Sequence, residues 1–267
     1  MSGQHPWETL DPKYIKRLEL ADIQGIPLLV DTVEQWDVVW GFKARPDDLL
    51  ICTYPKAGTT WMQEIVDMIQ HGARAPIYER IPFIELCLPK PLPSGEMIYV
   101  ARNAKDNAVS YFYFHKMDQM MPECGNWEEF LVDFMAGKVA WGSWCDHVCG
   151  WWKAKDHHPV LYLFYEDMKE DPAREIRKVA QFLGIELSEA VLKQIVQHTS
   201  FESMKMNPMA NYTTLPKNIM DTSVSCFMRK GTVGDWKQHF TVSQSERLDD
   251  LYAQALADSG LMFRTQI

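Results

Sequence analysis

One short run of this chain, YPKAGTTW at residues 54–61, contains the groups needed to bind an anion. Lys56 brings a full positive charge, Gly58 lets the backbone approach a ligand, and Thr59 and Thr60 bring hydroxyl donors. If a helix starts at these threonines, its first backbone N–H groups lack intrahelical partners and its dipole favours negative charge. The pattern therefore indicates an anion site.

The residues on either side of this run predict a strand before it and a helix after it. Leu49 to Thr53 is a short apolar run typical of a strand buried on both faces, and Trp61, Met62, Ile65, Val66 and Ile69 recur at helical spacing. A strand-to-helix turn with a surface lysine is the simpler alternative. It fits most Gly-Thr turns, but Pro-Lys-x-Gly-Thr-Thr-Trp between these flanks is far less common.

A second cation follows a second apolar run. Met97 to Arg102 reads as a buried strand, and Asn103 can cap a helix that passes through Ser110 to about Lys116. Ligands of open α/β sheets lie at the carboxyl ends of the strands, where Arg102 and Ser110 would stand. Arg102 by itself could equally form a surface ion pair.

A third basic group stands near the end of the chain, in the run FMRKG at residues 227–231. Arg229 and Lys230 can clamp a phosphate, and Gly231 allows close approach of the backbone. Taken alone, the run would be a solvated basic turn.

The elements that must position these groups alternate between strands and helices. Pro159 to Tyr165 reads as a third strand, Asp171 and Pro172 start a helix that ends before Gly184, and Ser188 starts another that runs to His198. Three such alternations predict an α/β fold, a single domain over residues 1–267 with a central parallel sheet and helices on both faces. We further expect a turn at residues 24–27, packing roles for Trp36, Trp40 and Phe42, a proline-rich loop over 73–95, and helix over 127–152 with structural roles for Trp141, Trp144, Trp151 and Trp152.

Composition narrows the function classes. The 267 residues are 46% hydrophobic and 24% charged, as in an ordinary globular protein. A net charge of −9 argues against general nucleic-acid binding, and no apolar run approaches the ~20 residues of a membrane span. The start lacks the apolar core of a signal peptide, and the six cysteines show no paired metal-ligand spacing, so we expect a cytoplasmic protein with reduced thiols and no metal.

Four ordered motifs resemble those of one family. Lys56 precedes the only glycine of its run, unlike a Walker loop, and YPKAGTTW is similar to the 5′-phosphosulfate loop of the cytosolic sulfotransferases, phenol-type subfamily 1. IYVARNAKDNAVS resembles their 3′-phosphate segment, FMRKG resembles the motif that closes over that phosphate, and Lys237 to Glu246 reproduces their dimer motif KxxxTVxxxE.

This resemblance implies a donor, 3′-phosphoadenosine 5′-phosphosulfate (PAPS), with 3′,5′-ADP as product. It implies that Lys56 is catalytic, that Trp61 and Phe201 stack on the base, and that Arg102 and Ser110 hold the 3′-phosphate. The full implied donor set is Lys56, Ala57, Gly58, Thr59, Thr60, Trp61, Arg102, Ser110, Tyr165, Thr199, Phe201, Phe227, Met228, Arg229, Lys230 and Gly231.

The resemblance also implies an acceptor pocket and a homodimer. Phe83 and Phe114 are candidates to contact the acceptor, and the methionines at 117, 120 and 121 suit an adaptable apolar surface. We expect a phenol or another hydrophobic alcohol or amine as acceptor, as in sulfate conjugation during xenobiotic metabolism. The dimer residues would be Lys237, Thr241, Val242 and Glu246.

One family segment is missing. Cytosolic sulfotransferases carry a Lys-Thr-His-Leu-Pro segment whose histidine is the general base, whereas here Pro93-Ser94-Gly95-Glu96 runs directly into the second strand. A shorter stretch is missing near Gly72. Either the sequence omits mobile loops of a longer chain, or the chain is a short form that binds PAPS without a base. We favour the first, since the loss would leave core surface exposed.

Three other hypotheses stay open. His115 could replace the missing base, although no second feature supports it. A phosphotransferase resembling nucleoside kinases would need Mg²⁺ and a Walker lysine, and the sequence shows neither. A donor-binding or dimer-scaffold protein without turnover would share every anion motif above.

Overall fold

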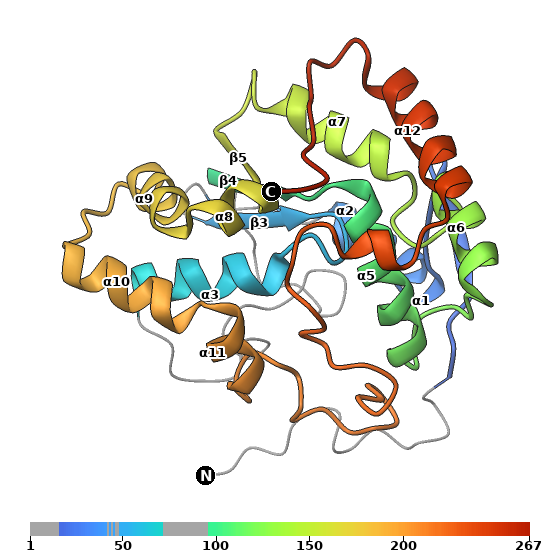
Figure 1. Ribbon diagram of the computed structural model, residues 1–267, viewed down its shortest axis with the longest axis horizontal. Helices are drawn as coiled ribbons and strands as arrows, with labels where there is room; N and C mark the ends of the chain where they lie inside the picture. Colours follow the sequence, from blue (N-terminus) through green and yellow to red (C-terminus); the bar gives the residue numbers. More distant parts are fainter. Residues whose placement is uncertain (1–15, 42, 44, 46–47, 72–95) are drawn as a thin grey trace.

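A three-stranded parallel sheet forms the centre of the computed structural model, which describes residues 16–41, 43, 45, 48–71 and 96–267. Its strands are β3 (Leu49–Thr53), β4 (Glu96–Ala101) and β5 (Val160–Phe164), in the order β3-β4-β5. Cys52 pairs with Tyr99, which pairs in turn with Tyr162. The predicted parallel α/β sheet is confirmed, with strand limits within one residue of the sequence prediction (Figure 1).

Helices cover both faces of this sheet because the buried residues of β4 alternate. Ile98 and Val100 pack into one apolar cluster with α3 (Thr59–Gln70), α9 (Pro172–Phe182) and α10 (Glu189–His198). The intervening Tyr99 and Ala101 pack into a second cluster, formed with α5 (Ala104–Met117), α6 (Trp127–Met135) and α7 (Trp144–Ala154). Figure 1 shows α3 and α10 on one side of the sheet and α7 on the other. A period of two along one strand thus supplies both layers.

Several helices start where the sequence places a capping side chain. Asn103 accepts from the Asp106 N–H at the start of α5, Asp171 accepts from Arg174 ahead of Pro172, and Ser188 accepts from Val191. These side chains satisfy N–H groups that the helix itself leaves unpaired. The predicted helix starts at Asn103, Asp171 and Ser188 are confirmed.

Shorter elements complete the chain. A hairpin of β1 (Leu20–Ile23) and β2 (Ile26–Leu29) turns at residues 24–25, so the turn expected at 24–27 is shorter and its last two residues belong to β2. The other elements are α1 (Val30–Glu34), α2 (Trp36–Trp40), α8 (Tyr165–Glu170), α11 (Phe201–Met206), the 3₁₀ helix η3 (Asp235–Gln238) and α12 (Val242–Leu256). The helices of the described residues include none long and apolar enough to cross a membrane.

The structure corrects three sequence predictions. The helix expected over 127–152 is interrupted between α6 and α7, where Gly137, Trp141 and Gly142 have positive φ values of 68°, 65° and 75° that no right-handed helix accepts. The side chains of β3 are partly exposed rather than fully buried, since among the described residues this strand pairs only with β4. Trp40 is 69% exposed and does not pack in the core.

Other predictions fall on residues that the structure does not describe. Phe42 and the proline-rich loop, with the proposed missing segments at its two ends, lie in this group, so the choice between omitted loops and a short form stays a prediction.

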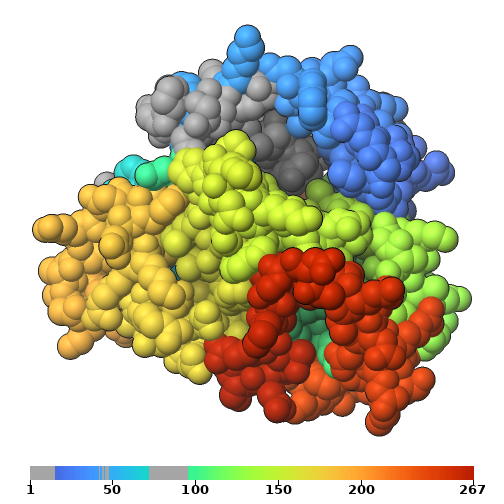
Figure 2. Space-filling model, turned by 90° about the horizontal axis from the view of Figure 1, so that it is seen from above, coloured from blue at the N-terminus to red at the C-terminus, as the bar shows by residue number. Residues whose placement is uncertain are grey.

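A small second cavity of about 400 Å³ lies between α12, the start of α5 and residues 260–265. Figure 2 shows its mouth as a hollow among the C-terminal residues (red). Lys105 stands beside it, with its ammonium 2.6 Å from Asp249 and 2.7 Å from the Ser245 hydroxyl. The beginning of α5 is therefore held by the C-terminal part of the chain.

Candidate active site

A cavity of about 870 Å³ opens at the carboxyl ends of β3 and β4, next to the first turn of α3. It brings together groups that are more than 170 residues apart in sequence. The predicted donor residues that line it are Lys56, Gly58, Thr59, Thr60, Trp61, Arg102, Ser110, Tyr165, Thr199, Phe201, Phe227, Met228, Arg229, Lys230 and Gly231. Ala57 is the exception: its side chain is buried and its N–H donates to the Tyr54 carbonyl at 3.1 Å, which supports the turn.

The turn before α3 leaves backbone donors facing the cavity. Gly58 is the N-cap residue, with a φ of 116°, and it has no side chain to accept from the first N–H groups of the helix. A Cβ at this position would lie 3.1 Å from the Tyr165 ring, so the close packing also requires glycine. Thr59 shares its hydroxyl with Thr53 at 2.5 Å, and the Thr60 hydroxyl lies 3.4 Å from that of Tyr212. This helix start suits an anion better than a capping side chain.

Lys56 projects from this turn with a strained backbone, since its φ is 66°. Its ammonium lies 3.4 Å from the centre of the Phe227 ring and 4.6 Å from that of Phe114. The pKa of Lys56 is lowered to about 7, mainly by burial and also by the nearby Arg102 and Arg229, while Asp118 acts in the opposite direction. The charge on this lysine therefore responds to any anion that enters the cavity.

Arg102 connects three segments of the cavity wall. It is 6% exposed, and it donates to the carbonyls of Lys56 at 3.1 Å and Thr232 at 3.4 Å. Its guanidinium lies 4.4 Å from the centre of the Tyr165 ring. The Nε atom is buried without a partner in the described part of the chain, so one strong donor remains for a ligand.

Arg229 provides a second such donor from the segment before η3. Its Nη2 lies 2.6 Å from Asp235, its guanidinium lies 4.8 Å from the centre of the Tyr113 ring, and its Nε is buried without a partner among the described residues. Gly231 nearby has a φ of 62°, and a Cβ there would lie 2.1 Å from the Phe201 ring. Glycine is therefore required for Phe201 to reach the cavity wall beside it. Lys230 is exposed at the rim.

Aromatic rings form the part of the cavity predicted for the base. Trp61 and Tyr165 meet edge to face with ring centres 5.3 Å apart, and Phe201 lines the same cavity. The Trp61 indole N–H is also buried without a partner in the described chain. Thr199 uses its hydroxyl internally, donating to the Ile195 carbonyl at 2.8 Å.

The charges of the cavity oppose those of the whole chain. Among the described residues, five cations line it, Lys56, Arg102, Lys169, Arg229 and Lys230, against the two carboxylates Asp31 and Asp118, although the chain carries a net charge of −9. Together with the three unpaired donors of Trp61, Arg102 and Arg229, this field fits a multiply charged anion that carries an aromatic group. The residues present therefore fit an adenine nucleotide with two phosphate-like ends.

An apolar compartment adjoins the cations. Phe114, Met120 and Met121 line it, facing Leu215, Ile219 and Met220 from the segment before FMRKG. Met117 is 1% exposed and belongs to the core. Phe114 thus lies where an acceptor would reach Lys56, whereas Phe83 lies outside the described residues.

Sequence reasoning missed several residues of the cavity wall. Lys169 lies one helical turn after Tyr165, so the spacing i to i+4 could have revealed it. Trp141 and Trp151, expected to be purely structural, also line the cavity, as do Tyr212 and Asp118. No local signal in the sequence marks these four.

The positions of two histidines bear on the hypothesis that His115 replaces the missing base. His115 is only 2% exposed, its Nδ1 lies 3.1 Å from the Pro122 carbonyl, and it is not among the residues that line the cavity. Burial lowers the pKa of His115 to about 4, and its place outside the cavity lining argues against a role as a replacement base. His147, which the sequence did not single out, does line the cavity, with Nδ1 2.8 Å from the Tyr99 hydroxyl.

The predicted dimer residues lie on the surface around the start of α12. Thr241 caps this helix by accepting from the Gln244 N–H, and Val242 is 75% exposed. Lys237 and Glu246 are exposed as well.

Comparisons with known proteins give a consistent result. A family model described as a sulfotransferase domain matches residues 46–94 and 87–260. Sulfotransferase 1C2 of Homo sapiens is 50% identical over 285 residues, covering 93% of this chain and 96% of its own length. Sulfotransferase 1C2 of Rattus norvegicus is 48% identical over 291 residues, covering 95% and 98%. Sulfotransferase 1A1 of Mus musculus is 48% identical over 287 residues, covering 94% and 99%.

These alignments also bear on the missing segment. The rat alignment runs over 291 positions while the present chain has 267 residues, so the relative contains residues without a counterpart here. The family model matches in two stretches that overlap at residues 87–94, shortly before Gly95 and Glu96, where the sequence analysis expects the missing segment.

Solved structures agree in fold. The crystal structure of mouse sulfotransferase SULT7A1 complexed with PAP is 31% identical, covers 90% of this chain and 96% of that chain, and superposes with a TM-score of 0.72. Retinol dehydratase in complex with androsterone and inactive cofactor PAP is 21% identical over 92% of this chain and 91% of that chain, with a TM-score of 0.82, and that likeness concerns the fold alone.

Proposed function

The chain belongs to the sulfotransferase family, and on that premise we propose that its large cavity binds PAPS and transfers the sulfuryl group to a small acceptor. The observation that carries the proposal is the meeting of Lys56, Arg102 and Arg229 in one cavity at the uncapped start of α3. Each of these cations has a buried or ring-packed head group, and two of them keep an unpaired donor.

The reaction needs positioning and charge stabilisation. The acceptor oxygen would form a bond to sulfur and release its proton to a base or to water, while the bond from sulfur to the bridging oxygen of the donor would break and leave its electron pair on the departing 5′-phosphate. Lys56 would neutralise the charge that grows on that bridging oxygen, and the first N–H groups of α3 with the hydroxyls of Thr59 and Thr60 would hold the 5′-phosphate. Developing charge in a dry cavity is stabilised more strongly than in water.

The remaining donor residues follow from their positions in the cavity. Arg102, Ser110 and Arg229 would hold the 3′-phosphate, with the Gly231 backbone closing over it. Trp61 and Phe201 would stack on adenine, supported by Tyr165 and Thr199.

The acceptor would enter through the apolar compartment. Phe114 and the methionines at 120 and 121 favour a phenol or another hydrophobic alcohol or amine, as in xenobiotic metabolism. We further propose that residues 1–267 form one sulfotransferase domain, that the protein works in the cytoplasm, and that it forms homodimers through Lys237, Thr241, Val242 and Glu246.

A second candidate is a protein that binds PAPS without turnover. The absence of a Lys-Thr-His-Leu-Pro segment before the second strand favours it, because in the family that segment carries the base. An assay of sulfuryl transfer to a simple phenol separates the two candidates, since only the first predicts product.

Nucleotide affinity tests the donor site in both candidates. We expect 3′,5′-ADP to bind at least ~10-fold more tightly than 5′-AMP in isothermal titration, because each charged hydrogen bond to the 3′-phosphate contributes about 1.5–3 kcal/mol. Equal affinity for the two nucleotides would contradict the assignment of Arg102, Ser110 and Arg229.

A further inference from the structure

Asp106 is a buried carboxylate that none of the roles above uses. It lies in the first turn of α5 and is 1% exposed. Its Oδ2 accepts from the backbone N–H of Gly234 at 2.8 Å, and its Oδ1 accepts from the backbone N–H of Trp236 at 3.0 Å. These contacts cross about 130 residues of sequence and join α5 to η3.

The residue between these two donors is the ion-pair partner of Arg229. Asp235 is 7% exposed and lies 2.6 Å from Arg229 Nη2. A carboxylate that fixes the N–H groups of residues 234 and 236 therefore fixes the backbone on both sides of Asp235. Arg229 lies outside regular secondary structure, so its position depends on contacts such as this ion pair and the contact with the Tyr113 ring.

The same carboxylate is tied to the start of α5. Asn103 Nδ2 donates to Asp106 Oδ2 at 2.9 Å and to Glu166 Oε1 at 2.8 Å, and the Asn103 N–H donates to that Glu166 oxygen at 2.9 Å. Asn103 directly follows Arg102. One buried network thus connects the anchors of both arginines that line the cavity.

A purely local role explains only part of this geometry. An aspartate in the first turn of any helix interacts favourably with the helix dipole. That role needs no partner outside the helix, whereas Asp106 satisfies two donors of a distant segment. The two hydrogen bonds could also serve only to stabilise the fold. The test must therefore measure ligand binding and not stability alone.

We infer that Asp106 is a positioning residue for recognition of the donor's 3′-phosphate, acting through η3 and Asp235 on Arg229. The inference rests on the proposed function, because it assumes that the cavity binds PAPS. It assigns to Asp106 a share of the selectivity for nucleotides with a 3′-phosphate, and no contact with the nucleotide itself.

The test measures the ratio of affinities for 3′,5′-ADP and 5′-AMP in Asp106→Asn. The asparagine keeps the shape but turns an NH₂ group toward one of the two N–H donors, so one contact is lost. We expect the affinity for 3′,5′-ADP to fall ~10-fold while that for 5′-AMP changes less than ~2-fold. A change in fold stability alone would shift the melting temperature and leave the ratio at its wild-type value.

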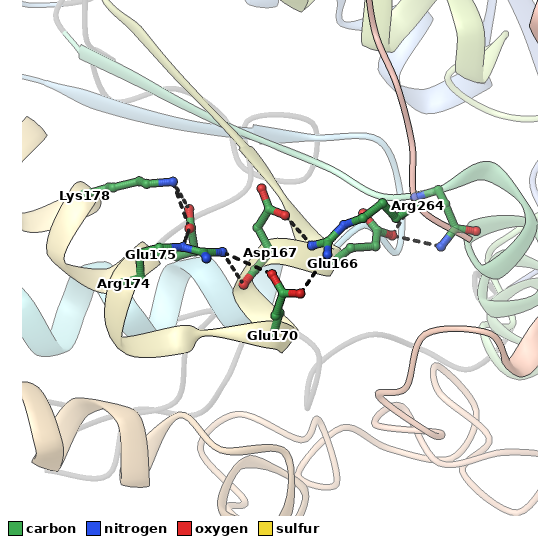
Figure 3. A network of polar contacts seen from close by, with 8 residues as sticks. Glu166, Asp167, Glu170, Arg174, Glu175, Lys178 and Arg264 are labelled. Atoms are coloured by element: carbon green, nitrogen blue, oxygen red, sulfur yellow. Dashed lines mark hydrogen bonds and ion pairs between the residues drawn. The ribbon is translucent and has the colours of Figure 1, made fainter. Parts of the chain in front are cut away.

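Asp167→Asn is the matched control. Asp167 lies next to Glu166 on α8, and it points toward Arg264, which keeps its second partner Glu170 at 2.9 Å (Figure 3). The substitution removes a carboxylate contact at the surface without touching η3, so the ratio should stay at the wild-type value.

A double-mutant cycle with Arg229→Ala tests the route of the effect. If Asp106 acts through Arg229, adding Asp106→Asn to Arg229→Ala should reduce the ratio no further. The inference would be overturned if Asp106→Asn lowered the affinities for both nucleotides equally. It would also be overturned if the double variant lost the full additional amount of the affinity ratio. A wild-type ratio near one would instead contradict the proposed function, so the two failures are distinguishable.

Discussion

Two parts of the cavity wall are proposed to bind the same ligand but are built differently. Residues 54–61 follow β3 directly and run into the start of α3. Their positions are therefore determined by elements that are adjacent in sequence. Residues 227–231 precede η3 without regular structure, and α5, Tyr113 and Asp235 hold them across more than a hundred residues of sequence. We call these the turn and the clamp.

This difference indicates which part suits transition-state stabilisation and which suits nucleotide selectivity. A turn fixed by its neighbours can hold a strained residue such as Lys56 in one place, which suits a group that acts in the transition state. A clamp held by distant contacts can adjust to a bound nucleotide, which suits selectivity and donor affinity. Substitutions in the turn should therefore change turnover, and substitutions in the clamp should change binding.

The largest expected effect tests the turn. Lys56→Ala should lower turnover ~10²–10³-fold, because its contact with the bridging oxygen strengthens in the transition state, and should change donor affinity less than ~5-fold. Steady-state kinetics with titration of 3′,5′-ADP measures both. Lys178→Ala, which removes a lysine paired with Glu175 outside the cavity, is the control. If turnover stays unchanged and the Michaelis constant rises, Lys56 acts in binding, as the clamp residues do, and the proposed difference between turn and clamp is wrong.

The next effect tests the clamp. Gly231→Ala should weaken 3′,5′-ADP binding ~10–100-fold, because a Cβ 2.1 Å from the Phe201 ring must displace the ring or the segment. Titration calorimetry measures the change. Gly184→Ala is a matched control, since Gly184 has a φ of 67° but no atom within 4 Å of the added carbon. If both variants bind equally well, backbone placement in the clamp does not limit affinity.

A smaller effect couples the two parts through protonation. The pKa of Lys56 is about 7 in the free protein, and an anion beside it favours the charged form. At pH 8 the free lysine is mostly neutral, so binding of 3′,5′-ADP should take up a fraction of a proton, and affinity should fall by ~5-fold at most as the pH rises above 7. Calorimetry in buffers of different ionisation enthalpy counts the proton.

Lys56→Met provides the control for that experiment because it has no ammonium to titrate. Proton uptake that persists in this variant would assign the effect to another group.

The smallest effect on activity is expected outside both parts. Val242→Glu should convert dimers into monomers, because it places a charge in a patch smaller than the ~800 Å² per partner of a standard interface, and should leave turnover within ~2-fold. Sizing chromatography with light scattering measures the mass. Val191→Glu, on an α10 valine that is 40% exposed, controls for added surface charge. An unchanged dimer would place the interface elsewhere.

The sequence predicted the turn better than the clamp for a physical reason. The apolar run before Thr53, the periodic residues after Thr60 and the caps Asn103 and Asp171 are local signals, and the strands and helices they predict form within one or two residues of the expected limits. Local patterns also supplied Arg102 and Arg229 as cavity residues.

The remaining features depend on tertiary packing. Nothing near Asp118 or Tyr212 in the sequence indicates that they line the cavity, and the bonds from Asp106 to η3 join segments that no periodicity relates. The break between α6 and α7 depends on positive φ at Trp141, a residue that rarely adopts it. His115 was considered as a base from its place on α5, and only three-dimensional packing shows it turned toward the Pro122 carbonyl.

The left-handed backbone of Lys56 has a consequence for the evolution and engineering of the protein. With a φ of 66°, a side chain here costs about 1–2 kcal/mol relative to glycine, and the same residue also buries an ammonium. A glycine would remove both penalties. Selection for heat tolerance alone would therefore favour loss of this lysine, and variants isolated in that way are expected to gain stability while they lose turnover.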